Sequence, residues 1–567
     1  MDTTVNDAAA TRPWNTGSVC NVAGALAWQA SQQPAAIAMH YPHRNTLGRV
    51  SGYRSCTYRE LNDLANAYAG GLEALGITAG TRTALMLRPG LNFVAVFFAL
   101  FKAGAVPVLI DPGIDRKSLK QCLGEAAPEA FIGVTRAQFA RRFLGWARNS
   151  LEILVTDGWA PGTGGTPLKK LARTDTVVEP VQHPTQADDL AAILFTSGST
   201  GAPKGVVYRH RHFVAQVEML RDTFAIEEGE VSLQTFPPFA LFDPALGMTT
   251  VIPDMDPTRP AEADPAALVE LIEKHEVTTV FGSPALLDTL SRHTEQTGHR
   301  MWSIRRVISA GAAVPLRVIR RLEGSLANDT LIHTPYGATE CLPVSNVTNQ
   351  ELDARVQDLT ESGEGFLVGQ PVTGNEVRVI RITDDAIDDI DDATPMPPGM
   401  PGEIIVRGPS CTDTYWARDT DTALGRIPDG SGGFWHRMGD VGILDGQGRL
   451  WYCGRVAQRI ETGKETLFAE QCEGVFNQHP DAARTAVVGV GPRGRQIPVL
   501  CVEVTGKLEP VDRERVHYDL LQLAQAHPLT RSVRTVLFHP GFPVDIRHNA
   551  KIGREELARW AAGQMQT

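Results

Sequence analysis

The chain has 567 residues, which is too long for one hydrophobic core and predicts two or more domains. Its hydrophobic content of 43% and charged content of 21% are typical of a globular protein. The formal net charge of −11 argues against the basic surface that a nucleic-acid-binding protein needs. We therefore expect no nucleic-acid partner, and we expect substrate anions to be bound by local donors.

The eight cysteines are scattered without CxxC or zinc-like spacing, which predicts reduced thiols and a cytoplasmic location. The first thirty residues contain Arg12 as their single basic residue and no sustained apolar run, so no secretory signal is expected. The most apolar stretch, residues 91–111, is interrupted by Lys102 and Pro107. It predicts a buried helix and a buried strand, and no membrane span.

The first predicted elements alternate between helix and strand. From Thr57 the apolar residues recur with a helical period, and Glu60 stands where a capping box requires it. A strand over 83–87, a helix over 91–102 and a strand over 106–110 follow. This order predicts a parallel sheet with helices on its faces.

An apolar strand over 190–196 leads into a loop of small residues. The loop contains Thr196, Ser197, Gly198, Ser199, Thr200 and Gly201, and Lys204 follows. Glycines let successive backbone N–H groups point into one concavity, and small hydroxyls add donors, so the loop predicts a phosphate cradle. Pro203 before Lys204 and Gly205 after it exclude the loop of kinases and GTPases. An ordinary surface loop is the alternative.

The run TSGSTGAPKG resembles the signature of the adenylate-forming superfamily, which includes acyl-CoA synthetases, luciferases and peptide-synthetase adenylation domains. The resemblance implies that the chain uses ATP and Mg²⁺. It also implies an α/β fold with a large N-terminal domain of several subdomains and parallel sheets, over residues 1–455. A small, mobile α+β domain over 456–567 would carry the catalytic lysine.

Two further stretches offer groups that suit a nucleotide. A strand over 306–309 runs into Gly311, Ala312 and Ala313, where the lack of bulky side chains would let a flat ring approach the backbone; a tight strand-to-helix turn is the alternative. The second stretch contains Tyr336, Gly337, Ala338, Thr339 and Glu340. It supplies an aromatic face for a purine, a hydroxyl for a phosphate and a carboxylate for Mg²⁺. It resembles the adenine and metal motif of the superfamily, which implies that Thr339 and Glu340 are catalytic and that Glu340 binds the metal.

Residues 382–401 are acidic and rich in proline, and they predict a solvated loop between strands. A metal site in this loop is the alternative, although the aspartate spacing fits no EF-hand. The next strand, over 402–408, is similar to the superfamily segment GEIxVRG.

A hairpin is predicted around the turn at Asp445 and Gly446. By resemblance, Asp440 binds the ribose hydroxyls, and Arg455 contacts the same sugar and opens the hinge. A turn or cap role is the alternative for Asp440. Strands over 485–490, 499–504 and 535–539 and a helix over 512–526 complete the C-terminal part. Lys551 aligns with the catalytic lysine of the superfamily.

Three departures from the superfamily bear on the acyl acceptor. Residues 241–244 lack the histidine of many CoA-forming members, the hinge carries Gln458 and Glu461 where Asp or Lys and then Ile-Lys are usual, and Lys551 ends an Arg-His-Asn-Ala-Lys run. Together these features resemble the β-lactone synthetases of bacterial olefin biosynthesis. That resemblance implies adenylation of a long-chain 2-alkyl-3-hydroxy acid, followed by attack of its own hydroxyl to give a β-lactone, AMP and pyrophosphate without CoA. Other enzymes of the olefin pathway would be partners in a multi-enzyme assembly.

Two other functions stay open at this point. The first is a long-chain fatty acyl-CoA ligase that acts through an acyl-AMP. The second is a nucleotide-binding assembly component without catalytic activity. The second is weakened because the expected catalytic and nucleotide-binding side chains are all present: Lys204, Thr339, Glu340, Asp440, Arg455 and Lys551.

Overall fold

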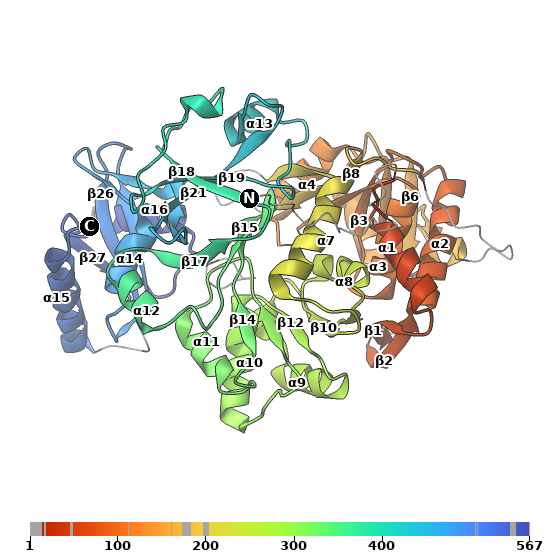
Figure 1. The fold of residues 1–567 in the computed structure, drawn as a ribbon, viewed down its shortest axis with the longest axis horizontal. Coiled ribbons are helices and arrows are strands. Elements are labelled where there is room, and N and C mark those ends of the chain that lie inside the picture. Colours follow the sequence, from red (N-terminus) through yellow and green to blue (C-terminus); the bar gives the residue numbers. More distant parts are fainter. Residues whose placement is uncertain are drawn as a thin grey trace, which may run out of the picture.

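The computed structural model describes residues 14–15, 19–45, 49–111, 113–159, 161–172, 183–196, 203–504, 506, 509–544 and 551–565. Over these residues the chain forms three large sheets and two small ones. Figure 1 shows the C-terminal part at one end of an elongated molecule and the first sheet at the other, with the other two large sheets between them.

The first sheet has seven strands, and six of them run parallel. In spatial order they are β7 (Thr166–Pro167), β6 (Ile153–Asp157), β5 (Ala130–Val134), β3 (Arg82–Met86), β4 (Val106–Ile110), β8 (Leu190–Thr196) and β9 (Lys204–Arg209). The edge strand β9 is antiparallel to β8. The helices of this part are α2 (Tyr58–Ala74), α3 (Leu91–Lys102), α4 (Arg116–Ala126), α5 (Thr135–Leu144) and α6 (Leu168–Leu171).

The sequence signals behind this sheet are confirmed. Thr57 Oγ1 accepts a hydrogen bond from the Glu60 amide (3.2 Å), and Glu60 Oε2 accepts one from the Thr57 amide (2.8 Å), which is the predicted capping box. The apolar helix α3 is buried on all sides and is followed by the buried strand β4. No described helix is long and apolar enough to cross a membrane.

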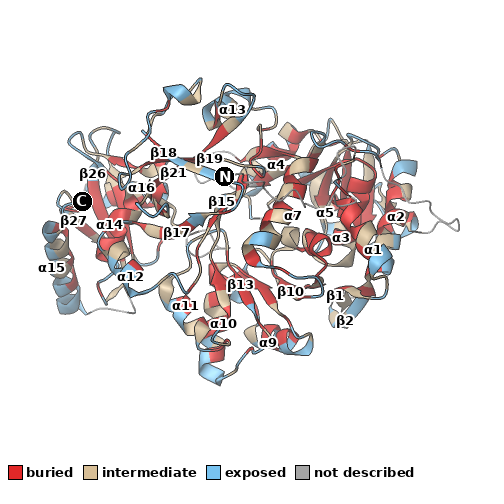
Figure 2. Ribbon diagram, viewed as in Figure 1, coloured by how far each residue is buried: buried red, intermediate tan, exposed pale blue. Residues whose placement is uncertain are grey.

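The second sheet also has seven strands. Their order is β14 (Leu331–His333), β13 (Arg306–Ile308), β12 (Thr279–Phe281), β10 (Val231–Gln234), β11 (Thr249–Val251), β1 (Ile37–Arg44) and β2 (Val50–Thr57), and only β2 is antiparallel to its neighbour. The accompanying helices are α1 (Ala23–Gln32), α7 (His210–Phe224), η1 (Pro237–Leu241), α8 (Asp243–Leu246), η2 (Pro260–Glu262), α9 (Pro265–Lys274), α10 (Pro284–Thr297) and α11 (Leu316–Glu323). One hydrophobic core contains residues of both parallel sheets and of the helices between them, and Figure 2 shows its buried strands and helices in red.

The third sheet is antiparallel and carries much of the site. Its strands follow the order β15 (Tyr336–Ala338), β16 (Cys341–Asn346), β17 (Phe366–Pro371), β22 (Leu450–Arg455), β21 (Phe434–Leu444), β19 (Gly402–Arg407) and β18 (Glu376–Ile380), and β20 (Arg426–Pro428) pairs with β21. It is accompanied by α12 (Ala354–Glu361), η3 (Ile390–Asp392) and α13 (Asp419–Gly425). The acidic stretch lies between β18 and β19, as predicted, and β21 and β22 form the predicted hairpin.

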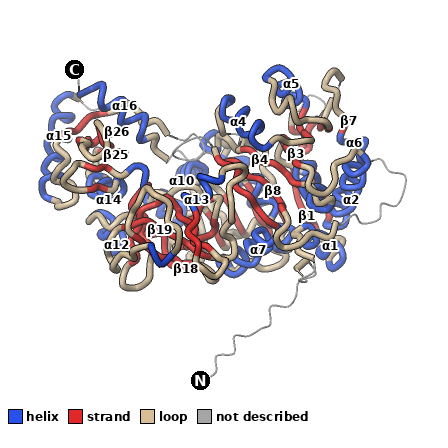
Figure 3. The backbone as a smooth tube through the Cα atoms, turned by 90° about the horizontal axis from the view of Figure 1, so that it is seen from above, coloured by secondary structure: helices blue, strands red, loops and turns tan. Residues whose placement is uncertain are grey.

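The C-terminal part forms a layered unit. Its elements are η4 (Val456–Gln458), β23 (Ile460–Glu461), β24 (Thr466–Leu467), α14 (Ala469–Phe476), β25 (Ala482–Val490), β26 (Ile497–Val504), α15 (Pro510–Ala526), β27 (Thr535–Phe538) and α16 (Arg554–Met565). Val487 packs with α14 and α15, whereas Ala486 and Val488 pack with α16, so helices cover both faces of the three-stranded sheet. Figure 3 shows this unit set to one side of the larger sheets.

Two hydrophobic cores of this unit contain only residues between 460 and 561. A core of its own is what an independent domain requires. The boundary at residues 455 and 456 and the mobility of the C-terminal domain stay predictions.

Candidate active site

A cavity of about 1500 Å³ lies where the second and third sheets meet the C-terminal unit. Predicted site residues from distant parts of the sequence line it: Lys204, Gly311, Ala312, Ala313, Tyr336, Gly337, Thr339, Glu340, Asp440, Arg455 and Lys551. Thr196 ends β8, and Ser197, Gly198, Ser199, Thr200 and Gly201 lie outside the described residues. Thr196 and Lys204 are paired across β8 and β9, so the predicted phosphate loop connects two antiparallel strands.

Asp440 and Arg455 face each other on β21 and β22. Asp440 is buried, its Oδ2 accepts a hydrogen bond from the Tyr336 hydroxyl (2.6 Å), and its Oδ1 lies 2.9 Å from Arg455 Nη1. Oδ1 accepts no well-aligned hydrogen bond from any described residue, so it has capacity for another donor. Burial raises the pKa of Asp440, while the charges of Arg455 and Lys551 and the Tyr336 hydroxyl oppose that rise.

The Tyr336 to Glu340 segment forms a tight β15–β16 hairpin. A side chain at Gly337 would place its Cβ 2.9 Å from the Cys341 carbonyl oxygen, so the turn requires glycine. The Thr339 carbonyl accepts a hydrogen bond from the Tyr208 hydroxyl of β9 (2.6 Å), which ties the hairpin to the first sheet. Glu340 Oε1 accepts a hydrogen bond from the Tyr415 hydroxyl (2.7 Å).

Gly311, Ala312 and Ala313 follow β13 and line the cavity with small side chains. Gly311 has a φ of 96°, which a residue with a side chain rarely adopts. This geometry is compatible with both sequence interpretations, because a tight turn also leaves an open surface for a flat ring.

Lys204 begins β9 and carries the positive charge expected beside the phosphate loop. Its Nζ lies 2.7 Å from Asp421 Oδ1 of α13 and 5.0 Å from the centroid of the Tyr415 ring. Asp421 therefore balances the Lys204 charge. Sequence reasoning missed both Tyr415 and Asp421; the aromatic pair Tyr415 and Trp416 was the available signal.

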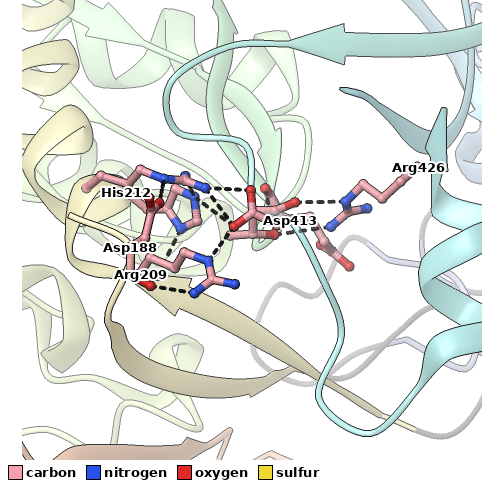
Figure 4. Close-up of polar contacts among 8 residues, drawn as sticks. Asp188, Arg209, His212, Asp413 and Arg426 are labelled. Atoms are coloured by element: carbon pink, nitrogen blue, oxygen red, sulfur yellow. Dashed lines mark hydrogen bonds and ion pairs between the residues drawn. The ribbon is translucent and has the colours of Figure 1, made fainter. Parts of the chain in front are cut away.

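A partly buried polar network holds the segment that precedes Tyr415. Arg209 Nε donates to Asp413 Oδ2 (2.7 Å), and Arg211 Nη2 donates to both Asp413 oxygens (2.6 and 2.7 Å). Burial lowers the pKa of His212 to about 3, so this histidine is neutral between the two arginines. Arg426 of β20 donates from Nε to the carbonyl of the preceding residue, Thr412 (2.8 Å), so residues 412 and 413 together join the start of α7 to β20 (Figure 4).

Lys551 is exposed and lines the cavity. Just after it, Arg554 is held by two carboxylates of α14: its Nη2 lies 2.7 Å from Glu470 Oε1 and 2.6 Å from Glu473 Oε2. Burial raises the pKa of Glu473 to about 8, against the opposing charge of Arg554. Arg554 thus anchors the terminal segment to the C-terminal unit.

One part of the cavity wall is mostly apolar. Its aromatic and aliphatic side chains are Leu220, Phe224, Ile226, Phe236, Phe239, Phe242, Leu246, Met248, Phe281 and Ile308. Asp243 lies among them, fully buried, and accepts hydrogen bonds from Gln234 (3.0 Å) and Thr250 (2.9 Å). Burial raises its pKa to about 7, and these hydrogen bonds oppose the rise. An aliphatic chain fits such a wall.

The acidic stretch and the hinge contact each other. Arg459 Nη2 lies 2.8 Å from Asp384 Oδ2, and Arg493 Nη2 lies 3.3 Å from Asp384 Oδ1. Glu461, which replaces the usual base, pairs with both arginines at 2.7 and 3.3 Å. Two arginines of the C-terminal unit therefore bind one aspartate of the large part of the chain.

The donors present suit ATP and Mg²⁺. The described residues contain no group of three or more His, Cys, Asp or Glu side chains that could hold a metal by themselves. Mg²⁺ usually takes one or two carboxylates and completes its shell with substrate phosphates and water. Glu340 is a carboxylate on the cavity wall, so a single protein ligand beside a bound triphosphate fits this chemistry.

A family model described as AMP-binding enzyme matches residues 26–416, which is more than half of the chain. The chain belongs to the AMP-binding enzyme family. This AMP-binding enzyme is 50% identical to the olefin beta-lactone synthetase of Xanthomonas campestris pv. campestris over 552 residues, with 96% of the chain and 98% of the relative covered. It is also 50% identical to the protein of the same name from Stenotrophomonas maltophilia, with 96% and 99% covered.

Solved structures share the fold. The amide bond synthetase McbA of Marinactinospora thermotolerans matches with a TM-score of 0.77 at 24% identity, covering 95% of this chain and 99% of that one. The o-succinylbenzoate CoA synthetase of Bacillus subtilis, solved with ATP and a magnesium ion, matches with a TM-score of 0.73 at 20% identity, covering 94% and 98%. As an AMP-binding enzyme with these relatives, the chain is an ATP-dependent adenylating enzyme.

Proposed function

We propose that this AMP-binding enzyme adenylates a long-chain 2-alkyl-3-hydroxy acid and closes it to a β-lactone, releasing pyrophosphate and AMP. The observation that carries the proposal is the 50% identity to an olefin beta-lactone synthetase across 96% of the chain and 98% of the relative. The apolar wall around Phe239 and Phe281 supports a lipid substrate.

In the first step a carboxylate oxygen of the acid attacks the α-phosphorus of ATP, and pyrophosphate leaves. Two anions must approach each other, so the site has to supply positive charge and fixed donors. We assign this role to Lys551 and Lys204, with Asp440 and Arg455 holding the ribose. When bound at Glu340, Mg²⁺ would neutralise phosphate charge. Thr196 to Gly201 would cradle the phosphates, and Thr339 would donate to them.

In the second step the substrate's 3-hydroxyl oxygen attacks the acyl carbonyl carbon. The bond between this carbon and the AMP oxygen breaks, AMP leaves with the electron pair, and the hydroxyl proton is released. The tethered hydroxyl has a high effective concentration at the carbonyl, which a diffusing thiol lacks. Cleavage of the adenylate offsets the strain of the four-membered ring.

The hinge supports an acceptor other than CoA. Glu461 is engaged with Arg459 and Arg493, so the position where relatives carry a base instead holds a carboxylate in an ion-pair network. CoA carries several phosphate charges that such a carboxylate would not attract. A fatty acyl-CoA ligase is the second candidate, because a long-chain-fatty-acid–CoA ligase of Thermus thermophilus is 27% identical over 80% of the chain.

Product analysis distinguishes the two functions. The enzyme is supplied with ATP, Mg²⁺ and either the 3-hydroxy acid or its 3-deoxy analogue, with and without CoA, and the acyl product is identified by mass spectrometry. We expect a β-lactone from the hydroxy acid regardless of CoA, and stalled acyl-AMP from the deoxy acid. Rapid CoA-dependent conversion of the deoxy acid to a thioester would establish the ligase instead. Failure to form acyl-AMP from either acid would favour an inactive binding component.

The same proposal places the enzyme in the cytoplasm. All eight cysteines are free and buried, as reduced thiols of a cytoplasmic protein would be. We also propose that this enzyme associates with the enzymes that supply the hydroxy acid and with those that consume the lactone. Co-purification with those enzymes tests it.

A further inference from the structure

The Tyr415 hydroxyl donates a hydrogen bond to the Glu340 carboxylate. Among the described residues, no other side chain donates a hydrogen bond to this carboxylate. The two residues are 75 positions apart, and their oxygens are 2.7 Å apart. Tyr415 is 8% exposed, and burial followed by the charge of Glu340 raises its pKa far above the ordinary value. The phenol is therefore protonated at physiological pH and donates its proton to Glu340 Oε1.

The Tyr415 ring also lies close to two cations. Lys204 Nζ is 5.0 Å from the ring centroid, and the Arg426 guanidinium carbon is 5.1 Å from it. Both distances fall within the range in which an aromatic face attracts a cation. One side chain thus contacts the carboxylate expected to bind a metal and the lysine expected to bind phosphate.

The backbone around Tyr415 is fixed to both structures that bear these groups. The Trp416 amide donates to the Gly205 carbonyl of β9 (2.7 Å), and the Thr412 amide donates to the Glu340 carbonyl (2.8 Å). Residues 412–416 therefore span the gap between the β9 strand that carries Lys204 and the β15–β16 hairpin, whose turn contains Glu340. Backbone hydrogen bonds at both ends leave Tyr415 little freedom to move.

We propose that Tyr415 is a positioning residue that orients the Glu340 carboxylate toward the divalent cation of the nucleotide and supports the Lys204 ammonium beside the phosphate loop. By occupying Oε1, the hydroxyl fixes the carboxylate rotamer and leaves Oε2 for the cation. Residues that hydrogen-bond to a metal-ligating side chain in this way tune the affinity of the site for the metal ion. The proposal concerns adenylation and holds whichever acceptor takes the acyl group.

Tyr415→Phe and Tyr415→Leu separate the two roles, because phenylalanine removes the hydroxyl and keeps the ring, whereas leucine removes both. Tyr68→Phe is the matched control: its buried hydroxyl donates to Asn92 Oδ1 (3.0 Å), and Tyr68 does not line the cavity. Calorimetry measures the affinity of a non-hydrolysable ATP analogue, once with EDTA and once with Mn²⁺. Melting curves establish that each variant is folded.

In the wild type we expect Mn²⁺ to strengthen binding of the analogue. In Tyr415→Phe this gain should fall by about tenfold, the scale of losing an outer partner of a metal ligand, while affinity in EDTA is retained. Tyr415→Leu should lose the same gain and also bind the analogue more weakly in EDTA. A gain in Tyr415→Phe within twofold of that in Tyr68→Phe would overturn the orienting role. Equal EDTA affinities for the leucine and phenylalanine variants would overturn the support of Lys204.

Discussion

The Asp440 carboxylate permits a test in which the contributions to binding and to folding are measured separately. Asp440→Asn keeps the shape of the side chain and removes its charge. Asp440 is 3% exposed, and its two oxygens serve the Tyr336 hydroxyl and Arg455. If the carboxylate also accepts hydrogen bonds from the ribose, the substitution weakens charge-assisted bonds, each contributing about 1.5 to 3 kcal/mol. The dissociation constant for ATP should then rise about tenfold to a hundredfold.

Folding stability also falls in this variant, because Arg455 loses its partner; its side chain is 28% exposed, so the loss is about 3 kcal/mol or less. Glu230→Gln is the matched control. Glu230 Oε1 accepts a hydrogen bond from Arg306 Nη2 (3.0 Å) in a buried pair that does not line the cavity. Calorimetry with ATP and denaturant unfolding are run on both variants. Comparable destabilisation with unchanged ATP affinity in both would mean that Asp440 only pairs with Arg455.

Three further substitutions test the charged groups. Lys551→Ala should slow adenylate formation by about a hundredfold or more while ATP affinity is retained, and near wild-type pyrophosphate release would remove Lys551 from the chemistry. Asp243 has a folded-state pKa near 7, raised by burial, so its contribution to stability is complete below the unfolded pKa and is lost as the pH rises to about 7. Between about pH 4 and 7, the unfolding free energy of the wild type should therefore fall by about 1.4 kcal/mol per pH unit more than that of Asp243→Asn. Unfolding free energies that change in parallel with pH in the two proteins would contradict this. Asp384→Asn should speed tryptic cleavage of the hinge about threefold relative to Asp388→Asn on the same loop. High salt should speed cleavage of the wild type in the same way, because it screens the ion pairs. Equal cleavage rates in the two variants would show that Asp384 does not hold the C-terminal unit.

The elements that could be predicted from the sequence are those with a strong local signal. The helix α3 and the strand β4 were predicted with the bounds that the structure gives, because each is an apolar run and because Lys102 and Gly104 separate the two runs. The capping box at Thr57 and the turn at Asp445 depend on neighbouring residues, and both are confirmed. In contrast, β9 was not predicted as an edge strand, because its pairing with β8 depends on a partner across the loop.

The partners within the site could not be predicted, because they are far apart in the sequence. Tyr415 contacts Glu340 across 75 positions, and Asp421 contacts Lys204 across more than two hundred. Neither pair leaves a periodic pattern, so only the three-dimensional structure reveals that the expected catalytic groups are already engaged. The acidic stretch was correctly predicted as a loop, but the ion pairs of Asp384 with Arg459 and Arg493 of the C-terminal unit required the structure.

The central claim is that ATP adenylates the substrate's carboxylate and that the substrate's own 3-hydroxyl then displaces AMP. Oxygen-18 tracing tests this claim most directly: a 2-alkyl-3-hydroxy acid labelled at both carboxylate oxygens is converted with ATP and Mg²⁺, and AMP and lactone are analysed by mass spectrometry. Attack of the 3-hydroxyl on acyl-AMP predicts one labelled oxygen in AMP and one in the lactone carbonyl. Unlabelled AMP with both labelled oxygens retained in the lactone would mean that ATP activates the hydroxyl, which contradicts the mechanism.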